Sequence, residues 1–297
     1  LHGLQHGPIL MALSAARSRK CPVMMIPSMH ADLAEDPVTT ELVSEVEQLG
    51  IKVHWGEEQE GKRKTPPHDE IVARFANFIN KNKANRKSVV ITLGATRSSI
   101  DDIRFVQNTS SGRTGYHIAD YLYRHGHDVT CVSGITTYPR PNWLPLDIYS
   151  DTPEKMLDEL KALSNDNIDA WVHSAAVLDY VVESPAEGKL ASQQGPLNIK
   201  LVESPKHILE LKEKCKDSVR IGFKLETGIK QKELVRRAVA QLEYAGMTAV
   251  IANRLEDLTD KNRPRAYLVD KTGADFTLET MLDVCEAIST VIGRGNR

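Results

Sequence analysis

The sequence predicts an α/β protein built on a doubly wound, mostly parallel sheet with helices on both faces. From residue 87 onward, short apolar runs alternate with segments of helical periodicity, as strands and crossover helices do in parallel sheets. Polar residues gather directly after the apolar runs, where the carboxyl ends of parallel strands hold ligands. A shorter alternation of the same kind comes before residue 86 and predicts a partial α/β segment in front of the main domain.

The composition fits a globular protein with a sizeable core. Of the 297 residues, 41% are hydrophobic and 26% are charged, and the formal net charge is −2. Because there is no basic excess and no apolar run of about 18 residues, we expect no nucleic-acid partner and no membrane partner. The four cysteines stand far apart without a CxxC pair, which favours a reduced, cytoplasmic setting. The chain opens without an initiator methionine or a signal peptide and reads as the continuation of a longer protein.

Residues 1–85 are expected to form the smaller segment. Its predicted strands lie at 21–27 and 51–56, a polar loop at 56–67, and helices at 8–19, 36–50 and 69–82. The helix at 36–50 has the clearest signals, because a proline stands at its start and a glycine ends it. The polar, basic run at 80–87 marks the boundary, so that residues 86–297 form the second domain. A solvated turn within a single domain is the alternative.

The second domain alternates regularly between the two element types. We expect strands at 87–94, 128–134, 168–177, 218–227 and 247–253, and helices at 115–126, 152–165, 204–215, 231–246 and 279–293. Thr152 is a suitable helix N-cap and Gly246 a suitable helix stop. Residues 265–278 predict an antiparallel hairpin that turns at Lys271, Thr272 and Gly273.

The connection at residues 100–115 is longer than the usual 2–6 residues or so between a strand and a helix. It ends in the run Ser110, Ser111, Gly112, Arg113, Thr114 and Gly115. Small residues and free backbone N–H groups at a helix start favour a phosphate or carboxylate site. The nucleotide fingerprints GxGxxG and GxxxxGK[ST] are absent. A serine-rich N-cap with a solvated arginine is the alternative.

Other strand ends carry matching chemistry. Small residues at Ser174, Ala175 and Ala176 would let a flat ligand lie on the backbone, and Asp179 follows them. The polar loop 183–200 carries Lys189, which would suit a mobile lid over phosphates. Tight packing under a helix and a solvated lysine are the alternatives. Polar residues also follow the strands at 218–227 and 247–253, so the ends together predict one shared cleft.

These separated segments resemble the phosphopantothenate–cysteine ligase family, in the family's order, over roughly residues 87–297. The family elements are G-G/A-T-R, D-x-x-R-x-x-x-N-x-S-S-G-x-x-G, A-A-V-x-D-Y, G-F-x-x-E-T and A-N. They are matched here, in this order, by Gly94, Ala95, Thr96 and Arg97; by Asp101, Arg104, Asn108, Ser110, Ser111, Gly112 and Gly115; by Ala175, Ala176, Val177, Asp179 and Tyr180; by Gly222, Phe223, Glu226 and Thr227; and by Ala252 and Asn253. The family's GGT is GAT in this chain. The family's lid lysine falls on Lys189. The lid differs from the family's version with several lysines, because "GKLASQQG" holds only that one.

The resemblance implies a Rossmann-like fold and an activity in coenzyme A biosynthesis. CTP, or ATP in some relatives, would activate 4′-phosphopantothenate as an acyl nucleotide with release of pyrophosphate, and cysteine would then form the amide. Mg²⁺ would assist, and the ligase domain would form a homodimer. The implied catalytic residues are Asn108, Lys189 and Arg104, and Asn108, Arg104 and Asp101 would bind the substrate. The implied nucleotide-binding residues are Gly94, Thr96, Ser110, Ser111, Gly112, Gly115, Ala175, Ala176, Asp179, Phe223 and Lys189.

Residues 1–85 resemble the second half of phosphopantothenoylcysteine decarboxylase, which implies a partial flavodoxin-like segment. The matching stretch reads Pro27, Ser28, Met29 and His30, and the histidine stands where that family has asparagine. We therefore do not assign a decarboxylase role to His30. FMN would bind only if a complete N-terminal domain exists, so the segment is either truncated or decayed to an interaction scaffold.

Two other classes of function share parts of the pattern. An NAD(P)-dependent oxidoreductase would have the same doubly wound sheet, but the GxGxxG turn is missing after residues 87–94. A non-catalytic regulatory subunit would explain the altered first segment. The presence of Asn108, Lys189 and Asp179 argues against that reading for the second domain.

Overall fold

The computed structural model describes residues 7–145, 147–192, 195–260, 262–272 and 275–295. The chain divides into two compact units, Leu1–Asn82 and Lys83–Arg297. Each unit is described by itself. Among the described residues, no helix is long and apolar enough to cross a membrane.

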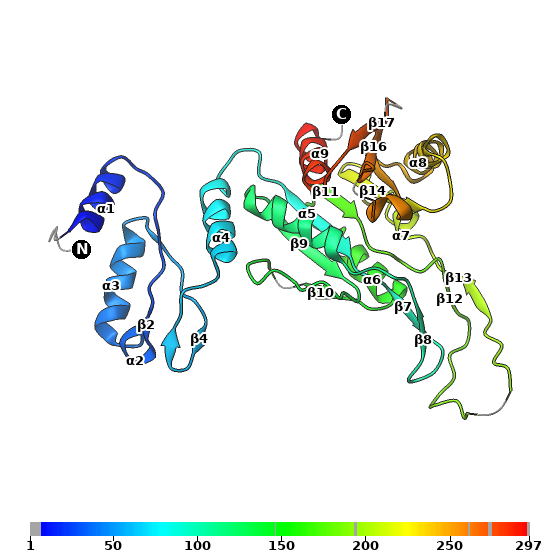
Figure 1. The fold of residues 1–297 in the computed structure, drawn as a ribbon, viewed down its shortest axis with the longest axis horizontal. Coiled ribbons are helices and arrows are strands. Elements are labelled where there is room, and N and C mark those ends of the chain that lie inside the picture. Colours follow the sequence, from blue (N-terminus) through cyan, green and yellow to red (C-terminus); the bar gives the residue numbers. More distant parts are fainter. Residues whose placement is uncertain (1–6, 146, 193–194, 261, 273–274, 296–297) are drawn as a thin grey trace. The chain divides into compact units, whose positions relative to one another are not determined.

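The first unit holds four helices and five short strands within its described residues (Figure 1). The helices are α1 (Pro8–Ser18), α2 (Ala31–Ala34), α3 (Pro37–Gln48) and α4 (His68–Asn80), and the strands are β1 (Met24–Met25), β2 (Met29–His30), β3 (Lys52–Val53), β4 (Glu58–Gln59) and β5 (Lys62–Arg63). Strand β1 pairs in parallel with β3. Asp36 caps α3 by accepting a hydrogen bond from the Val38 N–H, as its sequence signals suggest. A small core forms around Val46, Ile51 and Val53.

The polar loop predicted at 56–67 contains a hairpin instead. Strands β4 and β5 pair antiparallel, and β2 joins them as the third strand. The chain reverses at Glu60 and Gly61, whose φ angles are 55° and 68°. Two successive residues of positive φ are typical of the two-residue turn of a hairpin, because this turn matches the right-handed twist of the strands. The charged composition of the stretch favoured a loop and gave no indication of these strands.

The second unit is built on an eight-stranded sheet in the order β10-β9-β6-β11-β14-β15-β16-β17. The strands are β6 (Ser88–Leu93), β9 (Asp128–Ser133), β10 (Ile148–Tyr149), β11 (Ala170–His173), β14 (Val219–Glu226), β15 (Ala249–Arg254), β16 (Ala266–Asp270) and β17 (Asp275–Leu278). The first six strands in this order run parallel to one another. Strand β16 runs antiparallel to β15, and β17 runs antiparallel to β16. The chain order reverses between β6 and β11, so the predicted doubly wound, mostly parallel sheet is confirmed.

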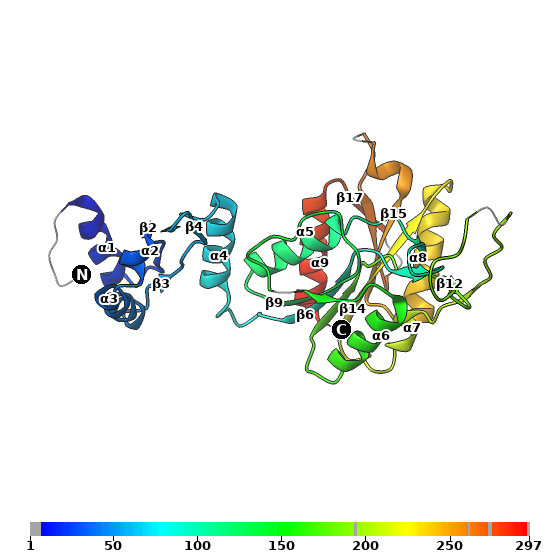
Figure 2. The same ribbon diagram turned by 90° about the horizontal axis from the view of Figure 1, so that it is seen from below.

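Helices cover both faces of this sheet. They are α5 (Arg113–Arg124), α6 (Pro153–Leu163), α7 (His207–Glu210), α8 (Gln231–Ala245) and α9 (Met281–Arg294), with a 3₁₀ helix η1 at Leu255–Leu258. Alternate residues of the strands point to opposite faces. Ile91 and Val172 pack with α5 and α9 on one face, while Val90 and Trp171 pack with α6 on the other. Helices α5 and α9 lie side by side (Figure 2).

Several sequence signals of the second unit are confirmed. Thr152 caps α6 by accepting from the Lys155 N–H, and Gly246 ends α8 in the left-handed conformation at φ 63°. The hairpin at 265–278 is formed by β16 and β17. Its predicted turn residue Gly273 lies outside the described residues.

Two antiparallel pairs in stretches predicted as loops extend from the carboxyl end of the sheet (Figure 1). Strand β7 (Arg97–Ser99) pairs with β8 (Phe105–Gln107) inside the long connection after β6. Strand β12 (Tyr180–Val182) pairs with β13 (Leu201–Glu203) at the two ends of the predicted lid. The connection at 100–115 is therefore long because most of it forms a hairpin arm.

The helix predicted at 204–215 is helical only over α7, and a buried arginine provides the reason. The Ile208 carbonyl oxygen accepts from Nη2 of Arg220 at 2.6 Å. The Lys212 N–H, which would bond Ile208 in a regular α-helix, bonds the Leu209 carbonyl at 3.0 Å instead. The next residues continue as turns.

Candidate functional site

The cleft begins where β6 and β11 end, at the point where the order of the parallel strands reverses. Their pairing continues past the named strands, since the Ala176 N–H donates to the Gly94 carbonyl and the Thr96 N–H donates to the Ala176 carbonyl. The backbone of residues 94–96 and 174–177 therefore forms a firm floor at the carboxyl edge of the sheet. Ligands of open α/β sheets bind at this position.

Two glycines allow α5 to start directly against this floor. Gly112 caps α5 at φ 78°, and a Cβ there would lie 2.6 Å from Cγ2 of Thr136. A Cβ on Gly115 would lie 2.3 Å from the Cβ of Leu93, so only glycine lets the helix approach β6 this closely. Both predicted glycines thus have a steric function that places the helix start beside the cleft.

The start of α5 borders a cavity of about 330 Å³. Its lining includes the predicted residues Ser110, Ser111, Gly112, Gly115, Ala175, Ala176 and Phe223. The N-cap residue Gly112 has no capping side chain, but the hydroxyls of Ser110 and Ser111 accept from the N–H groups of Gly112 and Arg113, both at 3.4 Å. The positive end of the helix dipole at this start still favours an anion. Arg113 and Arg265 also line the cavity, and within the described part of the chain neither pairs with a carboxylate. Burial and the charge of Arg113 lower the pKa of Arg265, as expected where positive charge is concentrated.

A second cavity of about 410 Å³ adjoins the first and shares Thr109, Ala175, Ala176, Phe223 and Leu225 with it. Its further lining consists of Thr92, Asn108, His173, Val177, Leu178, Asp179, Pro205, Lys206, His207, Ile208, Lys224, Gln241 and Tyr244. Asp179 is exposed at its rim. The cleft therefore has two compartments that meet over the backbone of residues 175 and 176.

Asn108 lies near this junction with its carboxamide fixed. Its side-chain N–H₂ group donates to the carbonyl oxygens of Ala176 and Val177, both at 3.2 Å. Because two carbonyl oxygens can only face the nitrogen, the orientation of the amide follows from the geometry. The side-chain oxygen remains as an acceptor.

Three of the predicted binding residues are used within the protein. Thr96 is fully buried, and its hydroxyl accepts from the Leu178 N–H at 2.9 Å. Asp101 accepts from the backbone of residues 103, 104 and 190, and from the guanidinium of Arg104. Hydrogen bonding to Arg104 holds the pKa of Asp101 well below its usual range. Arg104 also donates to the Leu190 carbonyl at 2.9 Å.

The Asp101–Arg104 pair ties the β7–β8 turn to the loop that carries Lys189. The Leu190 N–H donates to Asp101 at 3.1 Å, so the residue after Lys189 is held from both partners. Lys189 itself is exposed and lines neither cavity. Five predicted site residues line neither cavity: Gly94, Thr96, Asp101, Arg104 and Lys189. The other predicted site residues line at least one of the two cavities.

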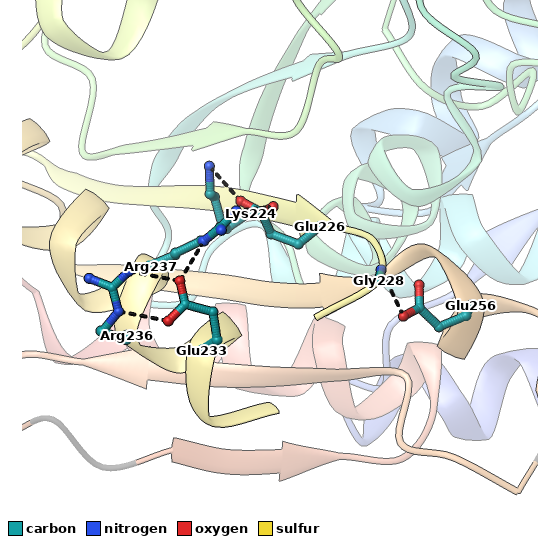
Figure 3. Close-up of polar contacts among 7 residues, drawn as sticks. All are labelled: Lys224, Glu226, Gly228, Glu233, Arg236, Arg237 and Glu256. Carbon is teal, nitrogen blue, oxygen red and sulfur yellow. Dashed lines mark hydrogen bonds and ion pairs between the residues drawn. The ribbon is translucent and has the colours of Figure 1, made fainter. Parts of the chain in front are cut away.

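Ion pairs connect Lys224, which lines the second cavity, through Glu226 to α8 (Figure 3). Glu226 bridges the Lys224 ammonium at 3.1 Å and Nη1 of Arg237 at 2.7 Å. Glu233 binds both Arg236 and Arg237. Lys224 lines the cavity, and its positive charge is neutralised by Glu226, while Lys206 lines the cavity as well.

Several residues that line the cleft carry no clear signal in the sequence. His173 lies inside an apolar run, His207 and Gln241 belong to helices, and Arg265 directly precedes β16. Burial, helped by the nearby charge of Arg220, lowers the pKa of His173 to about 3. Burial also lowers the pKa of His207. No group of three or more metal-ligating His, Cys, Asp or Glu side chains occurs in the described ranges.

The sheet order and the cleft at the reversal of the strands define a Rossmann-like α/β domain for small ligands. Residues 84–293 match the DNA/pantothenate metabolism flavoprotein C-terminal domain, and the chain belongs to this family. The family expected for residues 87–297 is thereby confirmed.

Similar proteins carry related names. The chain is 33% identical over 255 residues to the coenzyme A biosynthesis bifunctional protein CoaBC of Thermococcus kodakarensis, covering 86% of this chain and 62% of that protein. For the protein of the same name from Methanocaldococcus jannaschii, the identity is 32% over 238 residues, with coverage of 79% and 57%. The chain thus spans about three fifths of the length of these relatives. The solved C-terminal domain of a CoaBC protein superposes with a TM-score of 0.59 at 25% identity, covering 72% of this chain and 97% of that domain.

Proposed function

We propose that residues 83–297 form a nucleotide-dependent phosphopantothenate–cysteine ligase of coenzyme A biosynthesis. The observation that carries the proposal is the two-compartment cleft, with Asn108 fixed near the junction by the carbonyls of Ala176 and Val177. The names of the relatives support the pathway. The reaction joins an acid to an amine, and it needs one place for anionic phosphate and another for the activating nucleotide.

The proposed first half-reaction activates the acid. A carboxylate oxygen of 4′-phosphopantothenate attacks the α-phosphorus of CTP or ATP, and the bond to the leaving pyrophosphate breaks. The start of α5 with Arg113 and Arg265 would bind phosphate oxygens, and Ala175, Ala176 and Phe223 would carry the flat part of the nucleotide. Ala175, Ala176 and Phe223 line both cavities.

In the second half-reaction, the amine of cysteine attacks the acyl carbon and the nucleoside monophosphate leaves. The fixed amide of Asn108 offers an oxygen that accepts hydrogen bonds. We propose that this oxygen holds an N–H of the amine as it approaches. A neutral acceptor orients the amine without adding repulsion toward the phosphate.

Magnesium fits the site in the way that it usually binds nucleotides. Mg²⁺ needs only one or two carboxylates when substrate phosphates and water supply the other ligands. Asp179 provides such a carboxylate at the cavity rim. A bound ion would neutralise charge on the phosphates.

Lys189 is proposed to bind the triphosphate after a movement of the loop 183–200. The loop is anchored through Leu190 to the turn of the β7–β8 arm, outside both cavities. The arms expose Ile103, Phe105, Tyr180 and Leu201 to solvent. Because exposed apolar groups on one arm favour association, we propose a homodimer in which the arms meet, in a cytoplasmic setting.

For residues 1–82, we propose a relation to the flavodoxin-like decarboxylase part of longer relatives. The parallel pair β1–β3 supports this relation. A two-stranded parallel sheet does not bury both of its faces, and FMN would require the rest of such a domain. We assign no decarboxylase activity to this chain.

The test is release of pyrophosphate by the purified chain with 4′-phosphopantothenate, Mg²⁺ and either CTP or ATP. We expect release to require the acid, and release of the nucleoside monophosphate to require cysteine as well. No release with either nucleotide would refute the ligase. Tight binding of NAD(P) in that case would indicate the oxidoreductase, and binding without turnover the regulatory subunit.

A further inference from the structure

His173 ends β11, at the centre of the strand reversal. It lies between Thr92 of β6 and Gly222 of β14 in the sheet register, and it lines the second cavity. The residue is 8% exposed, and its Nε2 atom has no hydrogen-bond partner among the described residues. An unpaired polar nitrogen that is buried is costly and calls for an explanation.

The imidazole of His173 is uncharged at physiological pH. Burial is the main cause of its lowered pKa, and the positive charges of Arg220 and His207 add to it. A neutral imidazole offers one N–H donor and one nitrogen acceptor. It therefore suits an uncharged partner with both kinds of group, whereas a phosphate would favour the protonated ring.

The wall around His173 is suited to a flat ring, and Lys206, the other lysine of this cavity beside Lys224, is exposed to solvent. Phe223, Ala175 and Pro205 supply apolar surface, and His207 is a second histidine whose pKa burial lowers. Lys224 is paired with Glu226. Arg113 and Arg265, for which the described residues supply no carboxylate partner, line the other cavity.

Arg220 makes this wall rigid. It is 1% exposed and donates to the Ile208 carbonyl at 2.6 Å and to the Ala245 carbonyl at 2.6 Å. It thus joins α7, which carries His207, to the end of α8, which carries Gln241. Gln241 in turn donates to the Phe223 carbonyl at 3.3 Å. A fixed wall of this kind can discriminate between ligands because its donors and acceptors do not rearrange.

We propose that His173 is a specificity-determining residue that hydrogen-bonds to the edge of the nucleotide base at the inner end of the second cavity. This inference rests on the proposed function, since it concerns the nucleotide of that reaction. It explains why a polar side chain occupies the last position of an otherwise apolar strand. The phosphates of the same nucleotide would lie toward α5.

The experiment measures equilibrium binding of CTP, ATP and inorganic tripolyphosphate to the full chain, using calorimetry. His173→Phe removes the hydrogen bond, His173→Gln retains a donor and an acceptor, and Val172→Ala is the control for lost stability. Val172 is fully buried on the opposite face of the same strand. We expect His173→Phe to weaken the preferred nucleotide by about five- to tenfold, the value of one neutral hydrogen bond, and to reduce the CTP/ATP preference. Glutamine should restore part of the affinity.

Tripolyphosphate has no base, so its affinity should be the same in all four proteins. The inference is overturned if the folded His173→Phe variant keeps the nucleotide affinity and the CTP/ATP preference of the wild type within twofold. It is also overturned if the affinity for tripolyphosphate falls by the same factor as the affinity for the nucleotide. If the variants fail to fold, ¹⁵N spectra of the wild-type histidines decide. The His173 ring nitrogens must shift with the nucleotide and not with tripolyphosphate. A wild type that binds no nucleotide and releases no pyrophosphate refutes the ligase itself, and this inference with it.

Discussion

Replacing Asn108 with aspartate keeps the size of the side chain but reverses its interaction with the cleft floor. The amide nitrogen now donates to the carbonyl oxygens of Ala176 and Val177 at 3.2 Å. In Asn108→Asp, a carboxylate oxygen would replace that donor and face two carbonyl oxygens. The two hydrogen bonds contribute about 1 kcal/mol each, so we expect a loss of about 2 kcal/mol in the free energy of unfolding. For a unit of this size, that corresponds to a Tm lower by roughly 4–8 °C.

The chemical consequence should fall on the second half-reaction. The carboxylate turns away from the floor, and the acceptor no longer lies where the amine approaches. We expect pyrophosphate release to continue while the acyl nucleotide accumulates and cysteine is consumed slowly. Pyrophosphate and nucleoside monophosphate are followed separately, together with scanning calorimetry.

Gln107→Glu is the matched control for Asn108→Asp. It adds the same charge one residue earlier on β8, and the structure records no side-chain hydrogen bond for Gln107 within the described ranges. We expect it to leave both half-reactions and the Tm near the wild-type values. The reasoning about Asn108 is wrong if Asn108→Asp matches the wild type in both half-reactions, or if Gln107→Glu reproduces its effects.

Four further predictions concern the lid and the helix start. Lys189→Ala should abolish pyrophosphate release while leaving the Tm unchanged, and normal release would contradict its role at the triphosphate. Asp101→Asn should loosen the loop 183–200, seen as faster proteolysis there, since Asp101 and Arg104 anchor its backbone; an unchanged cleavage rate would contradict this anchoring. The pKa of Asp101 is lower in the folded than in the unfolded protein, so the carboxylate stabilises the fold fully above the unfolded pKa of about 4, and this stabilisation is lost as the pH falls below that value. The Tm difference between wild type and Asp101→Asn should therefore shrink on acidification. A Tm difference that grows would refute the prediction. Gly115→Ala should lower stability by about 1–3 kcal/mol in chemical denaturation, because its Cβ would lie 2.3 Å from that of Leu93, and an unchanged midpoint would show that the helix can shift.

The main sheet could be predicted because its signals are local and repeated. Apolar runs of strand length, helical periodicity, the Thr152 cap and the Gly246 stop all act within a few residues. The arm of β7 and β8 could not be predicted in this way. Its strands have only three residues each, too few to show a strand period, and its turn depends on the Asp101–Arg104 pair rather than on glycine or proline.

The shortened α7 shows a different limit of sequence reasoning. Residues 204–215 have good helical periodicity, but the carbonyl of Ile208 is taken by Arg220, twelve residues further on. A contact of this kind appears only when β14 is placed beside α7. Tertiary hydrogen bonding therefore overrides local propensity here.

Residues that line the cleft were predicted where they follow a strand, and they were missed where they end a strand or belong to a helix. Ala175, Ala176 and Asp179 line the cleft as the rule for strand ends predicts. His173 lies within the apolar run itself, so its polarity is the only signal. Thr96 shows the converse error, because a residue directly after a strand can serve the floor instead of the ligand.

The division of charge between the two cavities gives the cleft a direction. On one side, Arg113 and Arg265, which form no ion pair within the described residues, and the positive end of the α5 dipole attract an anion. On the other side, Lys224 is paired with Glu226, Lys206 is exposed to solvent, and His173 is uncharged. A nucleotide laid across the shared residues would therefore have its phosphates toward α5 and its base toward β11. The bond between phosphate and acyl group would then form near the junction, where the oxygen of Asn108 is held. A ligand with the opposite orientation would leave two arginines unneutralised and place charge beside a buried neutral ring, which is unfavourable on both sides.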